Sequence, residues 1–172
     1  MSGVILRELR QTRPFGSLEE EIIVGVQMAA HRLVAPWARI LDDRADLTPT
    51  QYNLLRILRG AGRDGRTCSE IAERLITRDP DVTRLTERLV RRGLARRDVD
   101  RVDRRVARIR ITQEGSALLR RLDPVIAELP RRLLRGMDTK QQRALLAGLE
   151  MLIAGAPQWT SPQEKGADHA EA

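Results

Sequence analysis

The chain has 172 residues and carries 31 Lys or Arg against 24 Asp or Glu, a net charge of +7. This length suits one domain of usual size, and the basic excess indicates a polyanionic partner or an anionic membrane surface. No apolar run approaches the ~18 residues that span a bilayer, and the N-terminal apolar stretch is too short for a signal peptide. One cysteine excludes an internal disulfide, so we expect a cytoplasmic protein without a membrane partner.

The N-terminal part is predicted to be an arm followed by a long helix. Residues 1–16 read as an extended arm, after which Ser17 and Glu20 have the spacing of a capping box with reciprocal hydrogen bonds. The helix runs to about Asp43, and Pro36 is expected to kink it without ending it. Its apolar positions recur at three- and four-residue steps: Ile22, Val26, Ala29, Leu33, Trp37 and Ile40.

Two shorter helices follow, each with its own start signal. Thr48 and Gln51 form a capping box around a proline at the first helical position, and this helix ends near Arg59 at a glycine-rich segment. Thr67 and Glu70 start the next helix in the same way.

A third helix is predicted from about Pro80 to Arg92, where Gly93 stops it. Its apolar residues share one side, which we expect to be buried: Val82, Leu85, Leu89 and Val90. The opposite face presents Asp81, Thr83, Arg84, Glu87, Arg88 and Arg91.

An arginine-rich hairpin comes next, with strands over residues 94–98 and 106–111 and a polar tip between them. Arg108 and Arg110 are expected to face outward from the second strand. The segment from Asp79 to Arg110 holds 11 Arg against six Asp or Glu, a balance of +5 in less than a fifth of the chain. The wing candidates at and beside the tip are Arg101, Asp103, Arg104 and Arg105.

Two long helices end the predicted domain. Thr112 caps the first, which Pro124 and Pro130 are expected to bend or divide. Asp138 and Gln141 cap the last, and the polar residues 156–172 are predicted to be a disordered tail. The predicted fold is therefore mainly α with a small β-hairpin, in the order of a winged helix-turn-helix. The terminal helices carry more apolar surface than such a module needs, which indicates a second copy of the chain.

This arrangement favours DNA binding. In a helix-turn-helix the second helix lies in the major groove, where Arg84 is placed to reach guanine and Arg88 to reach phosphate. Thr83 would meet phosphate or a thymine methyl. Asp81 is expected to cap the helix or shape the turn, with acceptance of a hydrogen bond from a cytosine amine as the alternative. A wing arginine suits a narrow minor groove, with Asp103 steadying its guanidinium. The alternative is an ordinary solvated helix face and a merely soluble loop.

Other chemistry finds little support in the sequence. No metal-ligand spacing, phosphate-binding loop or catalytic constellation is present, so we expect neither an enzyme nor a cofactor or metal. Cys68 reads either as a redox sensor near a helix N-terminus or as a small buried side chain. His31 and Trp37 are candidates for an effector pocket, with core packing as the alternative for Trp37.

The chain resembles the MarR family of bacterial transcriptional regulators over about residues 18–154. The resemblance rests on LTPTQYNLLRIL, SEIAERL, DVTRLTERLVRRGLARR and the wing DRRVARIRIT followed by QEG. It implies an obligate homodimer on a pseudo-palindromic operator of double-stranded DNA, often released by a small, commonly aromatic, anionic effector. Carried over by position, Thr83, Arg84 and Arg88 would contact DNA through the recognition helix, and Arg105 through the wing.

The sequence therefore predicts a ligand-responsive repressor. Its domains would be an arm (1–16), one domain (17–155) with the winged helix-turn-helix at about 48–112 between dimerisation helices at about 18–43 and 113–154, and the tail (156–172). Two alternatives stay open. One is a winged-helix module that docks an acidic protein and has no operator, and the other is a redox-sensing regulator that uses Cys68.

Overall fold

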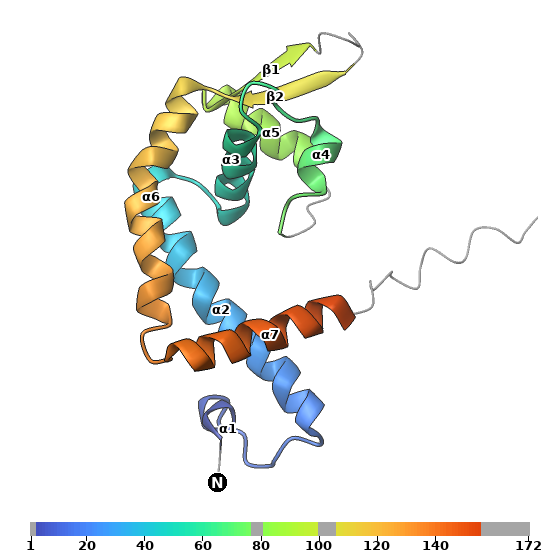
Figure 1. Ribbon diagram of the computed structural model, residues 1–172, viewed down its shortest axis with the longest axis vertical. Coiled ribbons are helices and arrows are strands. Elements are labelled where there is room, and N and C mark those ends of the chain that lie inside the picture. The colour runs from blue at the N-terminus through green and yellow to red at the C-terminus, as the bar shows by residue number, and fades with distance from the viewer. Residues whose placement is uncertain (1–2, 77–80, 100–105, 156–172) are drawn as a thin grey trace, which may run out of the picture. The chain divides into compact units, whose positions relative to one another are not determined.

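The computed structural model of the protein describes residues 3–76, 81–99 and 106–155. The chain divides into two compact units, Met1–Pro130 and Arg131–Ala172. In chain order the elements are α1 (Val4–Glu8), α2 (Leu18–Ala45), α3 (Pro49–Ala61), α4 (Cys68–Ala72), α5 (Val82–Arg91), β1 (Ala95–Val99), β2 (Ala107–Ile111), α6 (Gln113–Leu133) and α7 (Thr139–Gly155) (Figure 1). This order confirms the mainly α fold with a two-stranded hairpin.

Leucine side chains build the core of the first unit. The largest fully buried side chains come from the end of α2, the connection that follows it, α3 to α6 and β2: Leu41, Leu47, Leu54, Leu55, Leu58, Ile71, Leu89, Ile109 and Leu119. Each such burial is worth about 1.5–3 kcal/mol relative to exposure. Trp37 is half-buried against this core and meets Tyr52 edge to face, with ring centroids 6.3 Å apart. Core packing is therefore an observed role of Trp37.

The helix starts within the first unit follow the predicted capping pattern. The Thr48 hydroxyl accepts from the Gln51 backbone N–H (3.2 Å), and the Gln51 side chain accepts from the Thr48 N–H (3.0 Å). Thr67 and Glu70 repeat this box at α4, with bonds of 3.2 and 2.8 Å. Reciprocal capping removes two unsatisfied N–H groups at each helix start.

The N-terminal segment differs from the prediction in two ways. Residues 4–8 form helix α1 and not an extended arm, because Ile5 packs on α2 where Gly25 leaves room for it. A Cβ at Gly25 would lie 2.8 Å from the Ile5 side chain. The box at α2 is also incomplete: the Ser17 hydroxyl accepts from the Glu20 N–H, but the Glu20 carboxylate accepts from the Gly16 N–H.

The prolines do not end the helices that contain them. Pro36 lies within α2, and Pro124 and Pro130 lie within α6, which continues to Leu133. Of the two outcomes expected for Pro124 and Pro130, a bend or a division of the helix, the division is therefore wrong. Each proline removes one backbone donor, but the turns on either side retain their own hydrogen bonds.

An ion pair joins α3 to α6 at the surface of the first unit. Arg59 donates two hydrogen bonds to the Asp123 carboxylate, at 2.7 and 3.1 Å. This bidentate contact raises the pKa of Arg59 above its ordinary value. The two side chains are more than a third exposed, so the pair orients α6 more than it stabilises the fold.

The hairpin is antiparallel, with Ala95 opposite Ile111 and Val99 opposite Ala107. The first strand is shifted by one residue from the predicted range 94–98, and the second begins one residue later than predicted and ends at the predicted Ile111. Arg66, just before α4, forms an isolated bridge with Ile109, with backbone hydrogen bonds of 2.9 and 2.7 Å. The bridge attaches the base of the hairpin to the start of α4.

The second unit contains α7, which begins with the predicted cap. Asp138 and Gln141 exchange side-chain hydrogen bonds with each other's backbone N–H at 2.8 and 2.9 Å. No residue of α7 is buried. Its exposed large apolar side chains are Leu145, Leu146, Leu149, Met151 and Ile153.

Helix α6 starts in close contact with the residues before β1. The Thr112 hydroxyl donates to the Gly93 carbonyl (2.6 Å) and accepts from the Gly115 N–H (3.0 Å). A Cβ at Gly115 would lie 2.2 Å from the Leu94 carbonyl oxygen. Only glycine therefore fits this position without a backbone shift.

We expect Gly115→Ala to lower the free energy of unfolding by about 1–3 kcal/mol, because the added methyl group forces α6 away from Leu94. Gly148→Ala is the matched control, since a Cβ at this second helical glycine would meet nothing within 4 Å. It should be neutral or stabilise by up to about 1 kcal/mol. Denaturant unfolding followed by circular dichroism measures both, and equal effects would contradict the close approach.

Candidate nucleic-acid interface

Helix α5 has two chemically opposite faces. Its buried side consists of Val82, Leu85, Thr86 and Leu89. Thr86 was not among the predicted apolar residues, and it is accommodated because its hydroxyl donates to the Val82 carbonyl at 2.8 Å. The predicted contact residues all lie on the exposed side: Thr83, Arg84, Arg88 and Arg91. The structure therefore brings these four residues together on one helix surface.

Asp81 starts α5, as the sequence suggested. Its carboxylate accepts from the Arg84 backbone N–H at 3.0 Å and satisfies a free donor at the helix start. Pro80, the approximate start of this helix in the prediction, lies outside the described residues. The cap fixes where α5 begins and so fixes the register of the residues on its exposed face.

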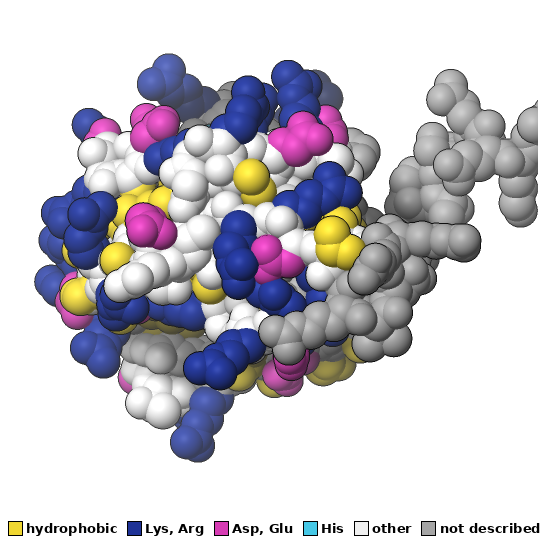
Figure 2. Space-filling model, turned by 90° about the horizontal axis from the view of Figure 1, so that it is seen from above, with side chains coloured by type: hydrophobic (Ala, Val, Ile, Leu, Met, Phe, Trp, Pro, Cys, Tyr) yellow, Lys and Arg dark blue, Asp and Glu magenta, His cyan; other side chains and the backbone are white. Residues whose placement is uncertain are grey.

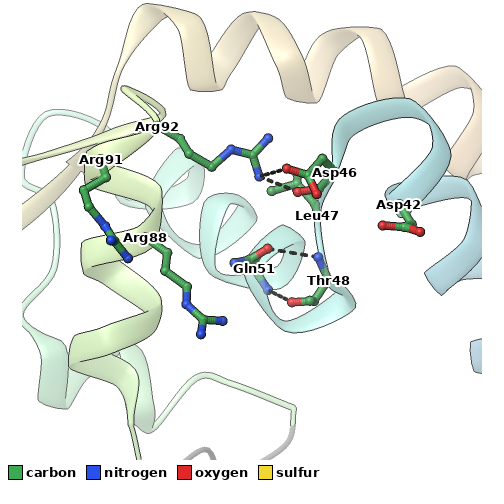
Figure 3. A pocket seen from close by; sticks show the side chains of 8 residues that line it. All are labelled: Asp42, Asp46, Leu47, Thr48, Gln51, Arg88, Arg91 and Arg92. Atoms are coloured by element: carbon green, nitrogen blue, oxygen red, sulfur yellow. Dashed lines mark hydrogen bonds and ion pairs between the residues drawn. The ribbon is translucent and has the colours of Figure 1, made fainter.

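The side chains of Arg88 and Arg91 project toward a hollow of about 410 Å³ beside the start of α3 (Figure 3). It is lined by Asp42, Asp46, Leu47, Thr48, Gln51, Arg88, Arg91 and Arg92. Within residues 3–76, 81–99 and 106–155, no hydrogen bond or ion pair engages the guanidinium of Arg88 or Arg91. Both cations are therefore available to an anion such as a phosphate.

Arg92 was not singled out from the sequence, although it is adjacent to Arg91. Its guanidinium donates to the backbone carbonyls of Ala45 and Asp46, and the bond to Ala45 is 2.7 Å long. It also lies 3.6 Å from the Asp46 carboxylate. Spacing along the chain gives no sign of this contact, because it joins residues 46 positions apart.

The second strand of the hairpin does not place its two arginines, Arg108 and Arg110, as predicted. Arg110 was expected to face out, but its side chain is 17% exposed and donates to Asp98 on the opposing strand at 2.7 Å. Arg96 contacts the other oxygen of the same carboxylate at 3.0 Å. Strand pairing sets Asp98 opposite Arg108 and leaves Arg110 diagonal to it, within reach of a long side chain.

Arg108 is also turned partly inward and lies 3.5 Å from the Glu70 carboxylate. The pKa of Glu70 is lowered, chiefly because its carboxylate accepts a hydrogen bond from the Thr67 backbone N–H. Arg108 and Arg66 add an electrostatic contribution in the same direction. The capping carboxylate of α4 is thus shared with the second strand of the hairpin.

Two hairpin arginines, Arg96 and Arg97, are exposed at the base of the first strand. On the face drawn in Figure 2, basic side chains recur around the surface and acidic ones lie among them. The predicted tip residues Arg101, Asp103, Arg104 and Arg105 lie outside the described residues. Their role stays a prediction.

The other candidate residues occupy different surroundings. Cys68 is a free, half-buried thiol that packs against the core at the start of α4. His31 is exposed on α2. Within the described ranges, no group of three or more His, Cys, Asp or Glu is arranged to hold a metal ion. Across the same ranges, no helix combines the length and apolar character needed to cross a bilayer.

Comparison with known proteins gives consistent matches. A family model described as MarR family matches residues 45–106. The HTH-type transcriptional regulator TtmR of Methylorubrum extorquens strain PA1 is 32% identical over 135 residues. That match spans 77% of this chain and 66% of TtmR, so about a third of the relative lies outside it.

Solved structures agree with the sequence matches. A MarR transcription factor from Planctomyces limnophilus is 30% identical with a TM-score of 0.60, over 80% of this chain and 99% of that one. Sco3205, a MarR family transcriptional regulator from Streptomyces coelicolor solved in complex with DNA, is 25% identical with a TM-score of 0.71. That match covers 87% of this chain and 94% of Sco3205.

We expect Asp98→Asn to destabilise the protein by about 1–3 kcal/mol, because Arg110 is largely buried and loses its carboxylate partner. Asp43→Asn is the matched control, since its pairing with Arg39 is long, at 3.9 Å, and exposed. That change should stay within about 0.5 kcal/mol. Thermal and denaturant unfolding measure both variants. A neutral Asp98→Asn would show that the hairpin does not depend on this carboxylate.

Proposed function

Because this chain belongs to the MarR family of DNA-binding transcriptional regulators, we propose that it is a homodimeric repressor of a pseudo-palindromic operator. The observation that carries the proposal is the exposed face of α5, where Thr83, Arg84, Arg88 and Arg91 lie opposite a buried apolar side. A helix fixed in the core by one side and cationic on the other is suited to the major groove.

Each residue of this face has a distinct part in the proposal. Arg84, in the first turn of α5, directs its guanidinium to the O6 and N7 acceptors of guanine. Arg88 and Arg91 bind backbone phosphates, and Thr83 contacts a phosphate or a thymine methyl group. Because Arg88 and Arg91 have no partner among the described residues, DNA binding breaks no internal ion pair of theirs.

The wing adds a second contact at each half-site. In the proposal, Arg104, Arg105 and Arg101 supply positive charge to the flanking minor groove, and Asp103 steadies one guanidinium. What supports this is the arginine content of the segment and its place between two paired strands.

A second copy of the chain accounts for apolar side chains that the single chain leaves exposed. On α2 these include Leu18, Ile22, Ile23, Leu33 and Val34, each more than 40% exposed. Burying them between two copies supplies the apolar area of a stable interface. Two-fold symmetry then presents two copies of α5 to half-sites about one helical turn, or roughly 10 bp, apart.

The proposal also includes release from DNA by a small anionic, commonly aromatic effector. Support for this part comes from the family resemblance. His31 and Trp37 on α2 are the candidate contact residues. The contact of Trp37 with Tyr52 would connect an occupied site to the start of α3.

Selection of duplexes from a random pool tests the proposed function. We expect the wild-type protein to enrich a two-fold symmetric site. Arg84→Ala should enrich the same site with one base position relaxed by about 1–3 kcal/mol of discrimination, because the bidentate guanine contact is lost. Arg120→Ala, which removes an exposed arginine on α6, is the matched control. If no symmetric site is enriched, a module that docks an acidic protein is favoured.

Arg105→Ala should weaken binding to all duplexes alike and lower the slope of log affinity against log salt by about one, because one phosphate-region cation is removed. Fluorescence anisotropy at several salt concentrations measures both quantities. An unchanged slope would exclude Arg105 from the contact, whatever the recognition helix does.

A further inference from the structure

We propose that Arg92 is a positioning residue that fixes α5 against the end of α2 and thereby sets the half-site spacing that the dimer accepts. The inference rests on the proposed function, because spacing has meaning only for a dimer on a two-fold site. Of the two neighbouring arginines Arg91 and Arg92, only Arg92 forms side-chain hydrogen bonds with other described residues.

The end of α2 is held rigidly in the core. Asp46 has a left-handed backbone (φ 49°), and its N–H donates to the Asp42 carbonyl at 2.9 Å. The next residue, Leu47, donates its N–H to the Leu41 carbonyl, and both leucine side chains are fully buried. This arrangement leaves the last carbonyls of α2, those of Ala45 and Asp46, without donors from the helix itself.

The end of α5 is built in a similar way. Gly93 has a left-handed backbone (φ 70°), and its N–H donates to the Val90 carbonyl at 2.9 Å. Leu94 donates to the Leu89 carbonyl at 2.9 Å, and both leucines are buried. These two bonds are the Schellman pattern of a helix end. Arg92 is therefore the last residue before the left-handed Gly93, and the hydrogen bonds of this helix end fix the position of its backbone.

From that point the Arg92 guanidinium reaches the end of α2 (Figure 3). One of its nitrogens donates to the Ala45 carbonyl and the other to the Asp46 carbonyl, with the Asp46 carboxylate close by. The planar fork of arginine matches two neighbouring acceptors, which a lysine ammonium does not. The guanidinium thus lies at the negative end of α2, where positive charge is stabilising, while its backbone stands at the end of α5.

The surroundings of this contact show that it crosses open space. Arg92, Asp42 and Asp46 line the hollow of about 410 Å³ beside α3 and also a second hollow of about 660 Å³ beside the start of α6. The side chain of Arg92 therefore spans between the two helix ends with a hollow on each side of it. Without the Arg92 side chain, water would replace the guanidinium as the hydrogen-bond donor to the Ala45 and Asp46 carbonyls, and this link between α5 and α2 would be lost.

The consequence concerns distance between half-sites. In the proposed dimer α2 contributes to the interface between copies, so a fixed link from α2 to α5 carries the dimer geometry to each recognition helix. One base pair inserted between half-sites moves them by about 3.4 Å and rotates them by roughly 35°. A rigid link makes that displacement costly, whereas a loosened link lets α5 follow the shifted half-site.

The experiment uses the full chain and the selected symmetric duplex, with one or two base pairs inserted or deleted at its centre. We expect wild-type affinity to fall about tenfold for a one-pair change, equivalent to about 1.4 kcal/mol. In Arg92→Ala the same change should cost less than about threefold. Arg120→Ala is the matched control, because it removes an exposed arginine on α6 outside the proposed DNA-binding surface, and it should keep the wild-type penalty.

Circular dichroism establishes that each variant is folded, and Arg92→Lys replaces Arg92→Ala if the latter is not. A folded Arg92 variant with the full wild-type spacing penalty overturns the inference, as does an equal loss of that penalty in Arg120→Ala. A wild-type protein that binds no symmetric duplex at any spacing overturns the proposed function itself. If the wild-type protein binds the symmetric duplex and Arg92→Ala keeps the same spacing preference, the inference is overturned and the proposed function stands.

Discussion

The attachment of α5 to the core through a single side is the constraint on which the rest of the structure depends. Leu85 and Leu89 belong to the buried core of the first unit, and the Thr86 hydroxyl donates to the Val82 carbonyl of the same helix. Because the apolar side of α5 is buried in the core, the polar residues on its opposite side face the solvent. Their exposure follows from apolar packing, and the basic face exists because the opposite face is buried.

Charge is distributed unevenly between contacts inside the protein and surfaces left to a partner. Arg92, Arg108 and Arg110 are occupied by carbonyls or carboxylates, and they position the helices and the hairpin. Arg88 and Arg91 have no such partner among the described residues. The number of arginines therefore overstates the positive charge available to a polyanion, because Arg92, Arg108 and Arg110 are engaged in contacts within the protein.

Local signals carried most of the prediction, and contacts between distant residues account for its errors. The boxes at Thr48 and Thr67 and the cap at Asp81 were predictable because each depends on residues three positions apart. The polar face of α5 followed from helical periodicity. The inward turn of Arg110 depends on strand register, and the contact of Arg92 with α2 depends on tertiary packing. Neither contact can be predicted from the spacing of residues along the chain. The same holds for helix α1, whose Ile5 packs against α2 at Gly25, where a larger residue would clash.

The bridge between Arg66 and Ile109 brings two points of the chain together that are more than forty residues apart. Helices α4 and α5 and both strands, apart from the last residues of β2, lie between them in the sequence. The two ends of this segment therefore lie next to each other in the structure. Between these ends, Ile71 and Leu89 share the buried core with α3 and α6. The segment that carries α5 and the hairpin is thus closed at its base and also packed against its support along its length.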